Sequence, residues 1–140
     1  MPVDFRDAAE RHWIDAGFLF AKNRMANTDH LLGMAAECAL KAIMLARGMG
    51  LRADGSPEES EHRVHINLLW DEFLTFSSNR DEARYAGPLL GDSNPFETWD
   101  VSQRYHHQSL FSRGGVEQHQ SAAEKVMRIL QLAVLDGVVP

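Results

Sequence analysis

The sequence predicts an all-α protein, and three observations support this fold class. Apolar residues recur every three or four positions in four separate segments, as on one face of a helix. No segment alternates strictly between apolar and polar residues, as a half-buried strand would. One segment, His30 to Leu45, is apolar nearly all round, which is typical of a helix surrounded by other helices. We therefore predict an antiparallel up-and-down bundle of four long helices, with a short extra helix and a pinned loop before the last helix.

The first helix is predicted over about residues 5–23. Asp4 can cap its N-terminus, and Asp7 lies in the first turn, where the helix dipole favours a negative charge. The second helix is predicted to begin at Asn27 or Thr28 and to end before Gly48, a natural C-cap. Residues 48–61 carry three glycines, a proline and several charges, so this segment is expected to be a mobile and dispensable loop.

The third helix is predicted over about residues 65–77, and a short helix is expected within residues 79–90. Residues 92–105 interrupt the helical pattern, and Pro95 favours an extended path there. Large side chains can pin this segment to the bundle, namely Phe96, Trp99, Val101 and Tyr105. The last helix is predicted over about residues 116–135, with an apolar stripe that begins at Val116.

Length and charge limit the possible functions. The 140 residues fit a single domain, residues 1–140. Acidic residues outnumber basic ones by 20 to 14, and the basic residues are scattered, so general DNA binding is not expected. The single cysteine, Cys38, excludes an internal disulfide. No apolar run approaches the roughly 20 residues of a membrane span, and the N-terminus has no apolar signal core, so we expect a cytoplasmic protein without membrane association.

Three titratable residues share one direction on the apolar second helix. At about 100° per residue, His30, Glu37 and Lys41 fall within a band about 40° wide. Glu37 and Lys41 also have the spacing of an ion pair on one helix face. The band is a thin strip facing solvent, a polar stripe lining a pocket, or a seam between two subunits. A buried charge pair needs further partners or a ligand.

The segment NTDHLLGMAAECALK, residues 27–41, resembles the second helix of HEPN-domain proteins. Two further segments support the resemblance, HINLLW from His65 and WDVSQRY from Trp99. The resemblance implies a helical bundle that usually forms a homodimer. Many members of that family are endoribonuclease toxins, and others are nucleotide-binding or accessory modules that work with small nucleotidyltransferases. A homodimer, a nucleotidyltransferase partner and a nucleotide or RNA ligand are therefore expected.

The ribonuclease members of that family carry an arginine, four to six residues, and then a histidine on a late helix. Three pairs in this chain have such spacing, about as many as chance predicts, and only Arg113 with His119 lies near the start of the last helix. Gly114 and Gly115 follow the arginine, where the family often has a polar residue. If the chain cleaves RNA without a metal, Arg113 would stabilise the scissile phosphate and His119 would act as general acid or base.

A separate cluster, RYHH, begins at Arg104. An arginine can hold a phosphate through two hydrogen bonds, and the neighbouring Tyr105 can stack on a base. Alternatively, Arg104 bonds to Glu37 across the bundle, and Tyr105 packs on the bundle as a loop anchor. The predicted ligand-binding residues are His30, Glu37, Lys41, Arg104 and Tyr105. We expect no metal, because His62 and His65 have no second pair with ligand spacing, and we expect no cofactor.

The leading functional hypothesis is an accessory or binding module, a dimer whose polar pocket takes a nucleotide, a phosphate ligand or a partner protein. Such a module would have a toxin–antitoxin or nucleotidyltransferase-associated role. One alternative is a metal-independent endoribonuclease toxin. The other is a structural bundle in which Glu37, Lys41 and Arg104 form a buried salt-bridge network without a ligand.

Overall fold

The computed structural model describes residues 2–80 and 83–140. Its α-helices are α1 (Phe5–Ala21), α2 (Met25–Ala46), α3 (Ile66–Ser78), α4 (Ala83–Ala86) and α5 (Arg113–Leu135). Short 3-10 helices are η1 (Ser60–His62), η2 (Gly87–Leu89), η3 (Val101–Tyr105) and η4 (Gln108–Leu110). Within the described ranges the only strand-like pairing is an isolated bridge between Leu51 and Pro57, so the all-α prediction is confirmed. The up-and-down order of the four long helices stays a prediction.

The ends of α1 and α2 follow from local chemistry. Asp4 caps α1 as predicted, because its carboxylate accepts a hydrogen bond from the backbone N–H of Asp7 at 2.9 Å. Asn23 turns the chain in the left-handed region, with φ of 60°, and α2 begins at Met25, two residues before Asn27 and three before Thr28, the two predicted caps. Gly48 has φ of 103°, which suits a residue without a side chain, and it follows the end of α2 as predicted.

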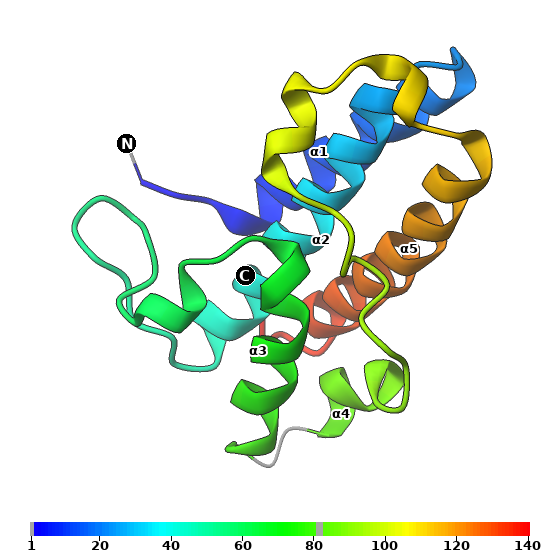
Figure 1. Cartoon of the computed structure of the whole chain (residues 1–140). Helices are drawn as coiled ribbons and strands as arrows, with labels where there is room; N and C mark the ends of the chain where they lie inside the picture. Colours follow the sequence, from blue (N-terminus) through cyan, green and yellow to red (C-terminus); the bar gives the residue numbers. More distant parts are fainter. Residues whose placement is uncertain (1, 81–82) are drawn as a thin grey trace.

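Helix α2 is the centre of the molecule (Figure 1). Nearly all of its residues from Leu32 to Met44 are buried, whereas α1 buries only Ala9 and Ala16 completely. Both α1 and α5 pack on α2, and they barely touch one another. The core therefore surrounds α2, as its uniformly apolar sequence predicts.

Residues 48–61, which follow α2, make more contacts with the rest of the chain than their composition suggested. Met49 and Pro57 are buried, and Arg63 donates to the carbonyl oxygens of Pro57 and Glu58. Gly55, with φ of 86°, lies where an added Cβ would meet Val3. The expectation that residues 48–61 have nothing to bury is therefore wrong, because a folded turn anchors two apolar side chains.

The segment between α4 and α5 lies along α2, with only short turns of helix. Trp99 is buried against Gly33 of α2, where an added Cβ would stand 2.1 Å from the indole. Phe96 and Trp99 pin the segment as predicted, but Tyr105 is 77% exposed, so its predicted role as an anchor is wrong. The short helix expected within residues 79–90 is α4 with η2, although residues 81 and 82 lie outside the described residues.

Helix α5 begins at Arg113, three residues before the predicted start, because the Ser112 hydroxyl caps it by accepting from the backbone N–H of Gly115 at 3.2 Å. Its other end is tied to α4 by Asp136, which accepts hydrogen bonds from Arg84 and from the Tyr85 hydroxyl. These two donors, Arg84 first, lower the pKa of Asp136 to about 2. No helix in residues 2–80 and 83–140 is both long and apolar enough to cross a membrane.

Candidate functional site

The polar band predicted on α2 is buried. Glu37 is 5% exposed, and its carboxylate accepts from Lys41 at 3.1 Å. Its other oxygen lies 2.9 Å from Nδ1 of His65, the residue just before α3. The band is therefore no strip facing solvent, and Glu37 has the additional partner that a buried carboxylate needs. We call these three residues the Glu37 network.

The predicted contact between Arg104 and Glu37 is wrong. Arg104 is exposed, and its guanidinium lies over the ring of Tyr105, 4.9 Å from the centroid. His65 takes the predicted place instead, since α3 begins beside the middle of α2, whereas η3 lies nearer the first turns of α2. His30 is half-buried and stacks on Trp99, and its Nδ1 atom is buried without a hydrogen-bond partner.

Three histidines near the Glu37 network differ in their electrostatics. The hydrogen bond to Glu37 raises the pKa of His65 above 6.5. Burial lowers the pKa of His30, and the nearby charges of Arg104 and His65 lower it further. Burial also lowers the pKa of His12, with a smaller contribution from Arg11. The protein therefore stabilises the charged form of His65 and the neutral forms of the other two rings.

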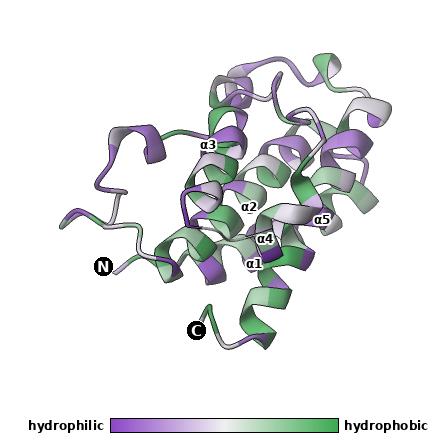
Figure 2. Cartoon of the chain, turned by 90° about the horizontal axis from the view of Figure 1, so that it is seen from below, coloured by the Kyte–Doolittle hydropathy of each residue, from purple (hydrophilic) through white to green (hydrophobic). Residues whose placement is uncertain are grey.

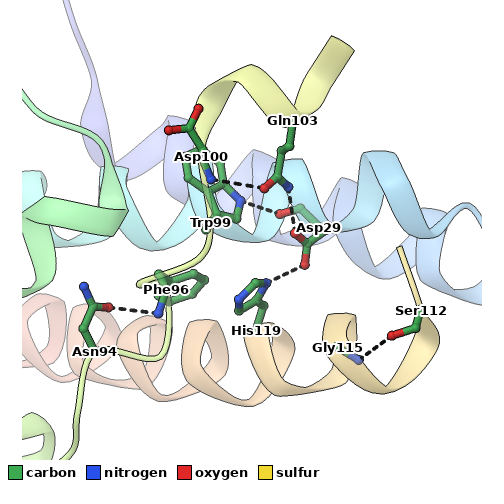
Figure 3. A network of polar contacts seen from close by, with 9 residues as sticks. All are labelled: Asp29, Asn94, Phe96, Trp99, Asp100, Gln103, Ser112, Gly115 and His119. Carbon is green, nitrogen blue, oxygen red and sulfur yellow. Dashed lines mark hydrogen bonds and ion pairs between the residues drawn. The ribbon is translucent and has the colours of Figure 1, made fainter. Parts of the chain in front are cut away.

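A second buried carboxylate, Asp29, joins three elements near the start of α2 (Figure 3). Its Oδ1 atom lies 2.6 Å from Nδ1 of His119 on α5, and its Oδ2 atom accepts from the side-chain amide of Gln103 in η3 at 2.7 Å. The indole N–H of Trp99 donates to the backbone oxygen of Asp29 at 2.9 Å. We call Asp29, Gln103 and His119 the Asp29 network.

Local structure fixes each member of the Asp29 network. Asp100 caps η3, and the side chain of Gln103 accepts from the backbone N–H of Asp100, which orients its amide. The ring of His119 stacks on Phe96, with centroids 5.1 Å apart. Because a carboxylate can only accept, Nδ1 of His119 carries the hydrogen and the other ring nitrogen stays available to a ligand.

Two cavities flank Gln103. One, of about 220 Å³, is lined by Asp29, Gln103 and His119 together with Ser112 and Gly115 at the start of α5. The other, of about 160 Å³, is lined by residues of the α1–α2 turn and of the segment after η3, among them Arg24, Asn27, Gln103, Arg104, His106 and Gln108. The two cavities share Gln103, so a ligand that spans both would contact the arginines and His119 together.

The site residues predicted from the sequence do not form one site in the structure. His119 and Arg104 each line one of the paired cavities, and exposed Tyr105 is next to Arg104. Glu37 and Lys41 line neither cavity. Arg113 is also outside both linings; it pairs with Glu117 at 3.3 Å and lies over the ring of Phe20. Arg113 and His119 are therefore not brought together within one chain.

Sequence reasoning missed Asp29, Gln103 and Arg24. A carboxylate early in an apolar helix was a usable signal for Asp29, because it must have partners when buried. Its partners come from residues 74 and 90 positions further along the chain, which no local pattern reveals. Gln103 and Arg24 have no sequence signal of their own, since their importance depends on the two cavities.

The described residues include no cluster of side chains suited to a metal ion, and their cysteine is not suited to act as a nucleophile. Within residues 2–80 and 83–140, no three His, Cys, Asp or Glu side chains lie close enough to hold a metal ion. Cys38 is buried, and burial, followed by the charge of Glu37, raises the pKa of its thiol to about 12. Such a thiol is a poor nucleophile.

Comparison with known proteins found no family model, no curated protein and no solved structure that matches this chain. The resemblance to HEPN-domain proteins therefore remains a prediction from the sequence.

Proposed function

We propose that the protein is a binding module for a nucleotide or another phosphate-bearing ligand, held at the paired cavities on either side of Gln103. The observation that carries this proposal is the convergence of Arg24, Arg104 and His106 on one small cavity, directly beside the Asp29 network. These cationic and polar groups come from segments about 80 residues apart, so the fold brings them together.

Electrostatics favours an anionic ligand at this cavity. The chain carries a net charge of −6, yet in the described residues neither Arg24 nor Arg104 has a carboxylate partner. An unpaired guanidinium offers a planar set of donors that matches phosphate oxygens. Exposed Tyr105, already in contact with Arg104, offers a ring on which a base can stack.

The proposal is tested by calorimetric titration of the full chain with AMP and with inorganic phosphate at low salt. Arg24→Gln and Arg104→Gln should each weaken binding by at least about tenfold, the effect of losing a charge-assisted hydrogen bond. Arg52→Gln is the matched control, because Arg52 is exposed in the loop after α2, away from both cavities. Unchanged AMP binding in both cavity variants, or no binding to the wild type, contradicts the proposal.

A metal-independent endoribonuclease is the second candidate, and the contact of 2.6 Å between Asp29 and His119 is the observation that favours it. A carboxylate that fixes a histidine ring is a recurrent arrangement in general acid–base catalysis. The test is incubation of the purified protein with RNA in EDTA. If this candidate is correct, His119→Ala abolishes cleavage and Arg52→Gln cleaves like the wild type. Wild-type protein that leaves RNA intact eliminates it.

Two further functional expectations, a toxin or accessory role and a small nucleotidyltransferase partner, rest on the HEPN resemblance alone. The cytoplasmic location stays an expectation from the sequence. The purely structural hypothesis is supported in modified form for the Glu37 network, where His65 replaces Arg104 as the partner of Glu37. It does not account for the unpaired arginines at the paired cavities.

A further inference from the structure

We propose that the cavity of about 220 Å³ around Asp29 is a nucleobase subsite, in which His119 and Gln103 recognise a donor and an acceptor that are neighbours on the edge of the base. This inference rests on the proposed function, because it assigns the parts of one nucleotide to the two cavities, the phosphate to the arginines and the base to His119. Pockets for a whole ligand usually measure roughly 300–1,000 Å³, so a cavity of this size holds only a part of one.

The lining of this cavity suits a flat ring with apolar faces and a polar edge. Its apolar surface comes from three residues, Leu110, Phe111 and Val116. Val116 lies three residues before His119 on one face of α5, a helix that carries both hydrophobic and hydrophilic residues (Figure 2). The carboxylate of Asp29 would repel a phosphate here, so the uncharged base belongs on this side of Gln103.

Asp29 fixes which hydrogen-bonding groups face the base (Figure 3). Nδ1 of the neutral His119 ring donates to the carboxylate at 2.6 Å, so Nε2 carries a lone pair and accepts. Within residues 2–80 and 83–140 nothing donates to this Nε2 atom, and the side chain is only 13% exposed. A polar atom that lines a cavity in this way needs a donor from the ligand.

Gln103 has the opposite polarity. Its side-chain oxygen accepts from the backbone N–H of Asp100 at 3.2 Å, and one hydrogen of its amide group goes to Asp29 at 2.7 Å. The second hydrogen of that amide group is left for a ligand, on a residue that is only 7% exposed. The subsite thus offers one acceptor and one donor, and the ligand must supply a donor beside an acceptor. Adenine has this pair, an exocyclic amino group next to a ring nitrogen.

The test is calorimetric titration of the full chain with AMP, ribose 5-phosphate and purine riboside 5′-monophosphate. The titrations are run at pH 8, because the neutral form of imidazole gains as the pH rises. The purine analogue keeps the phosphate, the ribose and the ring system of AMP but lacks the amino group, so it leaves Nε2 of His119 without a donor. AMP should bind at least about tenfold more tightly than either other ligand, since a site built to hydrogen-bond a group rejects an analogue without it.

Asp29→Asn changes the selectivity of the subsite and not only its stability. Gln103 is fixed by Asp100, so the new amide oxygen faces Gln103 and the new NH₂ group faces His119. Nδ1 of His119 must then accept, and Nε2 donates towards the amino group of AMP. The preference for AMP over the purine analogue should fall to about twofold or less. Glu37→Gln is the matched control, because it makes the same kind of change at the other buried carboxylate beside a histidine, and it should keep the full preference.

The outcomes separate this inference from the proposed function. If none of the three ligands binds the wild type, the proposed function fails and the subsite with it. If ribose 5-phosphate or the purine analogue binds the wild type as tightly as AMP, the phosphate site stands and the subsite is overturned. An Asp29→Asn variant that is folded by circular dichroism and keeps the full preference for AMP also overturns it. The comparison of ligands on the wild type decides the matter if this variant does not fold.

Discussion

Helix α2 holds two buried carboxylates in different surroundings. Glu37 contacts Lys41 of its own helix and His65, and neither Glu37 nor Lys41 lines the paired cavities. Asp29 contacts a neutral amide and His119, and all three members of its network line a cavity. The comparison shows that burial of a charge does not by itself mark a functional site. Access of a ligand to the polar groups separates a stabilising network from one that can act on a ligand.

The largest expected effect is the loss of stability in Glu37→Ala. Removing one partner of a buried pair leaves Lys41 without its carboxylate, which typically costs about 3–5 kcal/mol. Denaturant unfolding measures the change. Combined with His65→Ala, the total should be smaller than the sum of the single changes, because the two residues share one contact. Combined with Arg104→Ala, the effects should add, and coupling there would contradict the assigned partners.

Gly33→Ala should destabilise the protein by about 1–3 kcal/mol, the usual cost of an overpacked core. The added Cβ would stand 2.1 Å from the indole of Trp99, so the segment of η3 would have to move away from α2. Gly17→Ala on α1 is the control, since an added Cβ there meets nothing within 4 Å. Because Trp99 also anchors the backbone of Asp29, Gly33→Ala should weaken AMP binding too. If Gly33→Ala binds AMP as tightly as the wild type, the packing of Trp99 on Gly33 does not contribute to the binding site.

Asp29→Asn should cost about 1–2 kcal/mol, since one hydrogen bond to a charged group is weakened while the shape is kept. The effect on stability is thus smaller than for Glu37→Ala, but the effect on the site should be larger. We expect Asp29→Asn to impair binding of AMP, because Gln103 and His119 lose their common acceptor. Glu37→Gln should leave AMP binding unchanged. If calorimetric titration shows that Glu37→Gln impairs AMP binding and Asp29→Asn does not, the Glu37 network belongs to the binding site and the Asp29 network does not.

Much of the helical core was predictable from the sequence, because it depends on local pattern. The apolar circumference of α2 and the caps at Asp4 and Gly48 need only neighbouring residues to be recognised. Lys41 is one turn from Glu37, so that pair was predictable too. The predicted starts of α2 and α5 lie further along the chain than the observed starts. The start of α2 follows from the left-handed backbone conformation of Asn23, and the start of α5 follows from the cap that Ser112 provides. Composition reveals neither feature.

The candidate site was much less predictable. Arg104 and His65 were equally suitable partners for Glu37 by chemistry, and only the position of α3 against α2 decides between them. Tyr105 follows a buried Gln103 by two positions, yet η3 directs it to solvent. The partners of Asp29 arrive from η3 and α5, so their meeting depends on the packing of elements far apart in the chain.

The smallest expected effect is on the pH dependence of stability, and on the alkaline side it comes from His65 of the Glu37 network. The pKa of His65 is raised above 6.5, so its contribution is fully present below pH 6.5 and is lost as the pH rises through the higher folded pKa. The pKa values of His12 and His30 are lowered, so they oppose folding as the pH falls below 6.5. His65→Gln should therefore flatten the decline in melting temperature on the alkaline side. An unchanged alkaline profile in His65→Gln would contradict this assignment.

The most direct test of the central claim, that the paired cavities beside Asp29 bind a phosphate-bearing ligand, is an NMR titration of the ¹⁵N-labelled chain with AMP. Backbone amides that line the cavities should shift progressively, in particular those of Asn27, Gln103, His106 and Gly115. The amides of Glu37 and Lys41 should stay in place, since the Glu37 network lies outside the cavities. Shifts confined to the Glu37 network, or no shifts at millimolar AMP, would contradict the claim.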